Sequence, residues 1–143
     1  MSYQSEAQLE QQLIDQLKGQ GYEEVAIPDY DALVANFRVQ FEKFNAAKLT
    51  KPLSNKEWER VLNHLNGKSI FESAKILRDK YVLERDDGSK VYLAFIDEDH
   101  TKNLFQVSHQ TTVVGKYTNR YDVTLLVNGL PLVQIELKRR GID

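Results

Sequence analysis

The sequence predicts an α+β fold, because its two halves have different hydrophobic periodicities. In the first half, apolar residues recur at helical spacing and helix-capping motifs precede them. From Tyr81 onwards, valine, isoleucine, tyrosine, phenylalanine and threonine become dense, and polar turns such as 85–88 separate short runs. The chain has 143 residues, 41% of them hydrophobic, which is enough to bury a core. We therefore expect one globular domain over residues 1–143.

Helices are expected in the first half of the chain. Gln8 stands three residues after Ser5, the spacing of a capping box, and begins a helix that ends at Gly19. A second capping box, formed by Ser54 and Glu57, begins another helix. Together with an apolar stripe further along, these signals predict helices over about residues 6–18, 32–45, from Ser54 onwards, and from Ser69 to about Lys80.

Strands are expected in the second half, near residues 81–84, 90–97, 103–109, 120–127 and 132–138, with a further strand considered at 111–114. No internal repeat or linker is visible, so we place no domain boundary within the chain. Because no apolar run approaches the roughly 20 residues of a membrane span, and no signal peptide is present, we interpret the protein as soluble and cytoplasmic.

The charge balance and the cysteine count exclude several classes of site. Lys and Arg number 19 against 21 Asp and Glu, so a polyanion has to be bound by a local basic patch. The absence of cysteine excludes disulfides, thiolate zinc sites and cysteine nucleophiles. The three histidines, His64, His100 and His109, share no metal-ligand spacing, and His100 is expected to be a solvated turn residue.

The stretch 120–138 holds the residues with the most specific chemistry and is predicted to be a β-hairpin around Asn128-Gly129. Side chains alternate along a strand, so Asp122 lies on the face opposite Val123 and its apolar neighbours. Along the second strand, Glu136 and Lys138 likewise alternate with apolar residues. Since both apolar faces must pack on one core, Asp122, Glu136 and Lys138 are expected to share a surface.

The strand register provides a check on this surface. A two-residue Asn128-Gly129 loop would set Asp122 opposite Ile135 and put an acid on the core face, so we reject that register. A three-residue loop would set Asp122 opposite Glu136, and a five-residue loop would set it opposite Lys138. We therefore predict a loop with an odd number of residues or an equivalent bulge.

Two carboxylates and an amine on neighbouring strand ends suit Mg²⁺, which takes oxygen ligands and substrate phosphate. The ion would lower the pKa of a bound water, and Lys138 would orient or deprotonate that water. The alternative is that Glu136 and Lys138 only solvate a sheet face.

On the first helix, Glu6 lies on the axis of the apolar stripe and Glu10 lies within it. For Glu10 we favour a solvated residue at a helix start, stabilised by the helix dipole.

These residues resemble a known family, the N-terminal endonuclease region of the motor (R) subunit of type I restriction enzymes. That region is a branch of the PD-(D/E)xK nuclease superfamily, and the subclass called type IC is the most similar. The resemblance covers residues 3–6, 9–10, 13–14, 20–23, 36–38 and above all 119–138, whereas 45–100 match loosely. Tyr121 stands where the superfamily name has proline.

The resemblance implies a restriction-endonuclease-like α/β/α fold. That fold has a mixed central sheet of four to six strands flanked by helices, with a helical insertion after the first helix. It also implies that Asp122 and Glu136 bind Mg²⁺ with the Leu137 carbonyl, that Lys138 is the catalytic lysine, and that Glu6 is the acid of the first helix, with Glu10 as the other candidate. The family continues beyond residue 143 into ATPase domains, so we interpret the chain as an N-terminal fragment of a longer subunit.

The function implied is Mg²⁺-dependent hydrolysis of phosphodiester bonds in double-stranded DNA. In the full complex it is coupled to ATP-driven translocation, with methyltransferase and specificity subunits as partners. Sequence-independent phosphate contacts are expected from Lys116, Arg120, Lys138, Arg139 and Arg140. Two alternatives stay open: a non-catalytic assembly or docking fragment of that subunit, and another PD-(D/E)xK enzyme such as a repair nuclease or a resolvase.

Overall fold

The structure is a computed structural model that describes residues 6–66, 76–114 and 118–137, without the side chains of residues 6, 110–114 and 118–121. The chain divides into two compact units. Unit 1 comprises Met1–Phe37 and Leu104–Asp143, and unit 2 comprises Arg38–Asn103. Unit 2 therefore interrupts unit 1 along the sequence, as the expected insertion does. Each unit is described by itself.

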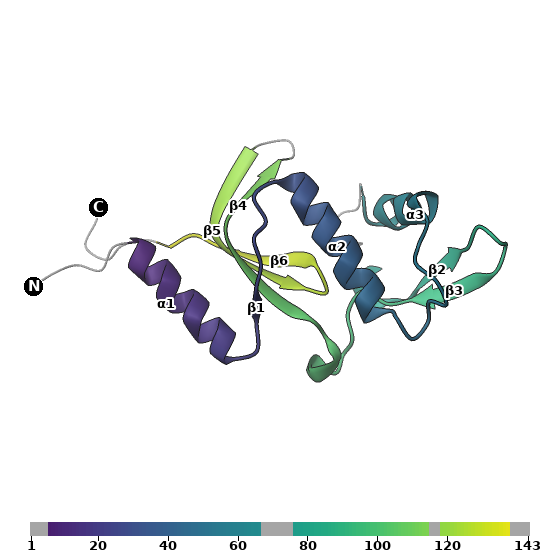
Figure 1. Cartoon of the computed structure of the whole chain (residues 1–143), viewed down its shortest axis with the longest axis horizontal. Helices are drawn as coiled ribbons and strands as arrows, with labels where there is room; N and C mark the ends of the chain where they lie inside the picture. Colours follow the sequence, from purple (N-terminus) through teal and green to yellow (C-terminus); the bar gives the residue numbers. More distant parts are fainter. Residues whose placement is uncertain (1–5, 67–75, 115–117, 138–143) are drawn as a thin grey trace, which may run out of the picture. The chain divides into compact units, whose positions relative to one another are not determined.

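The elements follow the order expected from the sequence, with helices before the main strands (Figure 1). The helices are α1 (Glu6–Gly19), α2 (Tyr30–Phe44), α3 (Asn55–Leu65) and the short 3₁₀ helix η1 (His100–Lys102). The strands are β1 (Glu23–Glu24), β2 (Tyr81–Glu84), β3 (Lys90–Leu93), β4 (Phe105–Val114), β5 (Thr118–Val127) and β6 (Leu130–Ile135). In the part of the chain that the structure describes, no helix is long and apolar enough to cross a membrane.

Unit 1 is built on a mixed four-stranded sheet in the order β1-β4-β5-β6. Strand β1 runs parallel to β4, and the other neighbours are antiparallel. This confirms the expected mixed sheet of four to six strands. The strands expected at 103–109 and 111–114 form one strand, β4, and the two-residue β1 is too short to leave a periodic signal in the sequence.

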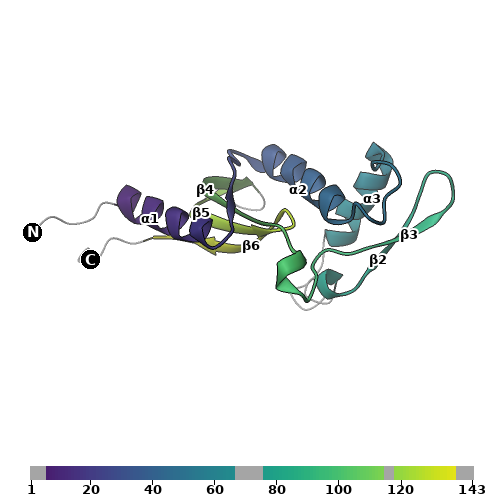
Figure 2. The same ribbon diagram turned by 60° about the horizontal axis from the view of Figure 1, so that its bottom comes forward.

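Helices cover both faces of this sheet. Helix α1 lies on one face (Figure 2). Its Ile14 packs there with Val107 and Val123. On the other face, Leu33 of α2 packs with Leu126. Val123 and Leu126 are three residues apart on β5, and side chains alternate along a strand, so they point to opposite faces. Unit 1 thus has the helix–sheet–helix layering that the family resemblance implies.

The β5–β6 hairpin combines a two-residue turn with a bulge. Asn128 and Gly129 have positive φ angles of 53° and 86°, as a tight hairpin turn requires, and Val127 pairs with Leu130. The register then shifts by one residue, because Leu126 pairs with Pro131 whereas Leu125 pairs with Val133. Ile135 pairs with Val123 and not with Asp122, so the register that we rejected does not form, and the predicted equivalent bulge is present. It restores the register in which Asp122 faces Glu136.

Unit 2 contains α3 and the hairpin β2–β3. The capping box predicted at Ser54 and Glu57 is confirmed: the Ser54 hydroxyl accepts the Glu57 N–H, and the Glu57 carboxylate accepts the Ser54 N–H. The strands expected near residues 81–84 and 90–97 are confirmed as β2 and β3, although β3 ends at Leu93, and they form a separate two-stranded sheet. The period-two signal reports a half-buried strand but not the sheet to which the strand belongs.

Aromatic rings and one ion pair stabilise unit 2. The ring of Phe41 lies 5.9 Å from Trp58 and 5.2 Å from Phe95, measured between centroids. The Arg85 guanidinium donates to the Glu57 carboxylate at 2.7 Å, with both side chains buried. Of the fourth helix expected over 69–80, residues 67–75 lie outside the described residues, and 76–78 are helical.

Candidate active site

The structure brings Asp122 next to the segment that follows β6. Asp122 lies on β5, half-buried, and its Oδ2 accepts the backbone N–H of Leu137 at 2.7 Å. Glu136 follows the last residue of β6, and its side chain is exposed. The β5–β6 pairing extends from Val123 and Ile135 toward Asp122 and Glu136. The two carboxylates predicted from the hairpin pattern therefore stand at the same end of the sheet, on neighbouring strands.

Within the described chain, the bond from Leu137 leaves much of the Asp122 carboxylate open. Among the described residues, it is the only hydrogen bond that this carboxylate makes. Two residues along β5, on the same face, the buried hydroxyl of Thr124 has no hydrogen-bond partner in the part of the chain that the structure describes. An acid held by one backbone donor has a fixed position and keeps lone pairs for a ligand. This differs from an acid that is fully engaged in the fold.

The donor set at this place suits a hard divalent cation. Two carboxylates and the Leu137 carbonyl present only oxygen, and Mg²⁺ is commonly bound by one or two carboxylates with water and phosphate completing its shell. Within the residues covered by the structure, no group of three or more histidines and acids is arranged to hold a metal ion. The oxygen ligands present fit Mg²⁺ better than a transition metal that prefers imidazole or thiolate.

Several residues of the predicted site lie outside the described residues. They are Lys116, Lys138, Arg139 and Arg140. Arg120 belongs to β5 and Glu6 begins α1, but their side chains are also outside the description. The described part of the site consists of Asp122, Glu136 and Leu137, and these three meet at one strand end.

Glu10 is a buried partner of a strand, which corrects our interpretation of a solvated residue at a helix start. Its side chain is on the inner side of α1, and the residue is 8% exposed. Its Oε1 lies 2.8 Å from Nδ1 of His109 on β4, and the other ring nitrogen of His109 lies 3.5 Å from Glu24. The position of Glu10 within the apolar stripe of α1 indicated that its side chain points toward the sheet. Its partner, 99 residues away, left no signal in the sequence.

Glu10 and Asp122 belong to opposite faces of the sheet. His109 pairs with Val123, so it lies on the face covered by α1. Asp122 is the neighbour of Val123 along β5 and therefore points to the other face. The bond between Glu10 and His109 attaches α1 to β4.

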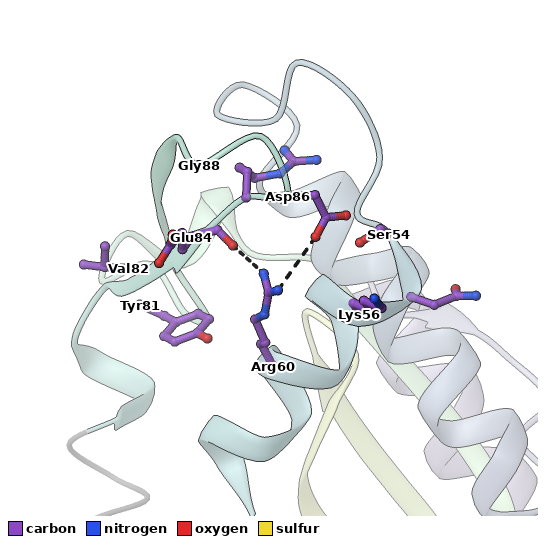
Figure 3. Close-up of a pocket in the computed structure, with 10 residues that line it drawn as sticks. Ser54, Lys56, Arg60, Tyr81, Val82, Glu84, Asp86 and Gly88 are labelled. Atoms are coloured by element: carbon purple, nitrogen blue, oxygen red, sulfur yellow. Dashed lines mark hydrogen bonds and ion pairs between the residues drawn. The ribbon is translucent and has the colours of Figure 1, made fainter.

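A pocket of ≈ 920 Å³ in unit 2 contains none of the predicted site residues. It lies between α3 and the β2–β3 hairpin, and Figure 3 shows Arg60 pointing across it toward Glu84 and Asp86. The Arg60 guanidinium donates to the Glu84 carbonyl at 2.7 Å and lies 3.8 Å from the Asp86 carboxylate. Because the protein itself engages this cation, Arg60 has an evident structural role, in joining α3 to the hairpin.

Comparison with known proteins identifies the family. The model of the type I restriction enzyme R protein N terminus matches residues 3–143. The chain belongs to this family. It is 55% identical over 145 residues to the type I restriction enzyme SsaAORF53P endonuclease subunit of Staphylococcus saprophyticus and 40% identical over 148 residues to the EcoprrI endonuclease subunit of Escherichia coli. The resemblance noted in the sequence is confirmed.

These relatives are longer than the chain. The alignment with the staphylococcal subunit covers 100% of this chain but 16% of the relative, and the alignment with the Escherichia coli subunit covers 99% and 46%. The SauMSSORF170P endonuclease subunit of Staphylococcus aureus shows the same identity and coverage as the first relative, 55% over 145 residues and 16% of its length. The chain therefore corresponds to a minor part of each relative.

Proposed function

We propose that this chain is the endonuclease region of a type I restriction enzyme R subunit and hydrolyses phosphodiester bonds in double-stranded DNA with the help of Mg²⁺. Family membership supports this, as does the endonuclease designation of its relatives. The observation that carries the proposal is the bond from the Leu137 N–H to Asp122 beside Glu136. It holds Asp122 against the residue that follows Glu136, which supports pairing these two acids in the PD-(D/E)xK pattern.

Each residue of the centre has a role in this proposal. Asp122 and Glu136, with the Leu137 carbonyl, would hold Mg²⁺, and Glu6 would supply a further acid from α1. When bound, the ion neutralises charge on the phosphoryl oxygens and lowers the pKa of a bound water. Lys138 would orient or deprotonate that water. The Leu137 N–H fixes the orientation of Asp122, so the carboxylate is in place before substrate arrives.

DNA is bound through its phosphates in this proposal, by Lys116, Arg120, Lys138, Arg139 and Arg140. Such contacts are independent of sequence, which suits an enzyme whose recognition of DNA resides in another subunit. In the complete enzyme, methyltransferase and specificity subunits are the partners, and cleavage is coupled to ATP-driven translocation in the cytoplasm. ATP belongs to the motor regions of the longer subunit and not to these residues.

Binding of Mg²⁺ is tested by thermal melting of the purified chain. A ligand that binds only the folded state raises Tm, by an amount equivalent to about 2.7 kcal/mol at a hundred times Kd. We expect Mg²⁺ to raise the Tm of the unaltered chain and to have no effect on Asp122→Asn, which keeps an oxygen to accept the Leu137 N–H. The matched control is Asp79→Asn, an exposed acid of unit 2, which should respond like the unaltered chain.

Cleavage is tested in the complete R subunit with its partner subunits. Lys138→Ala should lower DNA cleavage by about 10²–10⁴-fold, the usual contribution of a general base, and leave ATP hydrolysis and translocation unchanged. A chain whose Tm ignores Mg²⁺, or an Asp122→Asn variant that responds fully, contradicts the proposed centre and favours a non-catalytic docking fragment. Cleavage that occurs without methyltransferase and specificity subunits favours a repair nuclease or a resolvase instead.

A further inference from the structure

Three lysines from separate segments of unit 2 converge on one groove. Lys48 follows α2, Lys80 immediately precedes β2, and Lys102 ends η1. The groove has a volume of ≈ 270 Å³. Its other lining residues are Phe44, Asn45, Ala47, Tyr92, Ala94 and Asp97. We call it the lysine groove. Its lining thus combines three cations with one carboxylate.

The three cations are exposed and available to a ligand. None of them forms a salt bridge with another residue that the structure describes. Three arginines of unit 2 differ, because Arg38, Arg60 and Arg85 each have a carboxylate partner. Three exposed lysines against one lining carboxylate leave the groove with a net positive charge, and a mobile anion is attracted to such a place.

Two acids beside the groove, Asp97 and Asp99, accept hydrogen bonds within their own loop. Asp97 Oδ1 accepts the backbone N–H of Asp99 at 2.8 Å. Asp99 Oδ1 in turn accepts the N–H and the hydroxyl of Thr101 at 3.1 and 2.7 Å. These bonds hold the carboxylates within their own loop. Lys102 is near Asp99, but no ion pair within 4.0 Å joins them in the described chain.

Two buried asparagines hold the groove in shape. The Asn45 side chain donates to the carbonyl of Ala94 and accepts its N–H, so the end of α2 is attached to the end of β3. Asn103 likewise bonds the N–H and the carbonyl of Asp97, which closes the loop that carries Lys102. The lysines therefore extend from a fixed framework, and little backbone ordering is needed when an anion binds.

Tyr92 adds an aromatic ring and a hydroxyl to the groove. It is 57% exposed, an unusual position for a large side chain, and its cross-strand partner Val82 is also exposed. A tyrosine hydroxyl is among the groups that contact nucleic-acid phosphates, together with lysine and arginine. An exposed tyrosine beside three lysines is therefore suited to a phosphate backbone.

We propose that the lysine groove, formed by Lys48, Lys80 and Lys102 with Tyr92, binds the phosphate backbone of double-stranded DNA independently of sequence. The inference rests on the proposed function, which makes DNA the substrate, and adds a contact that belongs to unit 2. Lysine is a flexible point charge that pairs with phosphate without reading bases. The groove retains DNA on the protein while the centre at Asp122 cuts it.

Binding is measured by fluorescence anisotropy with a short labelled duplex of mixed sequence over a range of salt concentrations. Each phosphate contact contributes about −0.9 to the slope of log K against log salt. The triple variant Lys48→Gln/Lys80→Gln/Lys102→Gln should lose about 2–3 from the magnitude of this slope and bind at least about tenfold more weakly at about 50 mM salt. Tyr92→Phe should weaken binding by a smaller factor.

The control is the triple variant Lys51→Gln/Lys56→Gln/Lys90→Gln, which removes the same charge from exposed lysines of unit 2 outside the groove. It should bind DNA within about twofold of the unaltered chain. Melting curves verify that both triple variants are folded. The proposal is overturned if both weaken binding equally, if the unaltered chain binds no duplex at about 50 mM salt, or if the groove lysines bind poly-glutamate but not DNA.

This experiment separates the groove from the proposed cleavage centre. The Tm response to Mg²⁺ is measured without DNA and reports on Asp122, so the groove variant should retain it. A chain that responds to Mg²⁺ but binds DNA equally well without its groove lysines overturns only the groove. A chain that binds DNA through these lysines but ignores Mg²⁺ overturns only the proposed function.

Discussion

The acids of the two units serve different purposes. In unit 2, both oxygens of Glu57 accept hydrogen bonds, from the Ser54 N–H, the Asp86 N–H and the Arg85 guanidinium. In unit 1, Asp122 accepts one hydrogen bond within the described chain, and it stands beside the exposed Glu136. A carboxylate whose lone pairs are all engaged stabilises the fold. A carboxylate positioned by one donor is available to a ligand.

The largest expected loss of stability follows from breaking the buried ion pair between Arg85 and Glu57 in unit 2. Arg85→Ala removes the partner of a buried carboxylate and also two bonds to the carbonyls of Lys51 and Pro52. Breaking a buried pair in this way costs about 3–5 kcal/mol. Urea unfolding of the chain should show a loss of this size. Arg60→Ala, at the exposed pair with Asp86, is the control and should cost about 0–1 kcal/mol.

Acid should weaken the same pair. Burial by itself raises the pKa of Glu57, but hydrogen bonds from Arg85, Ser54 and Asp86 outweigh it and lower the pKa from 4.5 to about 2. Because the folded pKa lies below the unfolded one, the ionised group stabilises the fold fully above pH 4.5, and this contribution is lost as the pH falls toward 2. The stability gap between the unaltered chain and Glu57→Gln should therefore narrow below pH 4.5. A gap that stays constant down to pH 2.5 contradicts this.

A smaller effect is expected at the pair that attaches α1 to the sheet. His109→Ala removes a hydrogen bond of the buried Glu10, but the imidazole itself is 43% exposed. Loss of a partner by a buried polar group costs about 1–3 kcal/mol. Urea unfolding should place this variant between Arg85→Ala and Lys18→Ala, whose exposed pair with Glu24 contributes about 0–1 kcal/mol.

His109→Ala also tests whether Glu10 only stabilises the fold while Asp122 binds the metal ion. Glu10 and Asp122 belong to opposite faces of the sheet, so His109→Ala should leave the Tm response to Mg²⁺ intact. If the response disappears in a folded His109→Ala variant, the pair at α1 belongs to the metal site, and the division between the two faces is wrong.

Local signals in the sequence account for much of the fold. The capping box at Ser54 and Glu57 is formed by residues three apart, so propensity and hydrogen bonding within one turn suffice to predict it. The alternation around Asp122 likewise required that a bulge or an odd loop restore the register, because the opposite arrangement would bury an acid among aliphatic residues. It did not determine which of the two occurs.

The remaining features depend on contacts between distant segments. The partner of Glu10 is His109, and the lysine groove joins residues 48, 80 and 102. The β2–β3 hairpin has the same alternation as a strand of the main sheet, yet it pairs only with itself in the described structure. Such arrangements follow from packing that no periodic pattern within one segment records.

By itself, the sequence determined the order of helices and strands, the shared surface of Asp122 and Glu136, and the family resemblance. Each of these depends on residues close together along the chain, where backbone geometry sets which side chains are neighbours. The tertiary structure alone decided that Leu132 forms the bulge, that Glu10 is buried against His109, and that three lysines meet in unit 2. Those outcomes depend on which segments, distant along the chain, pack against one another and bury their surfaces.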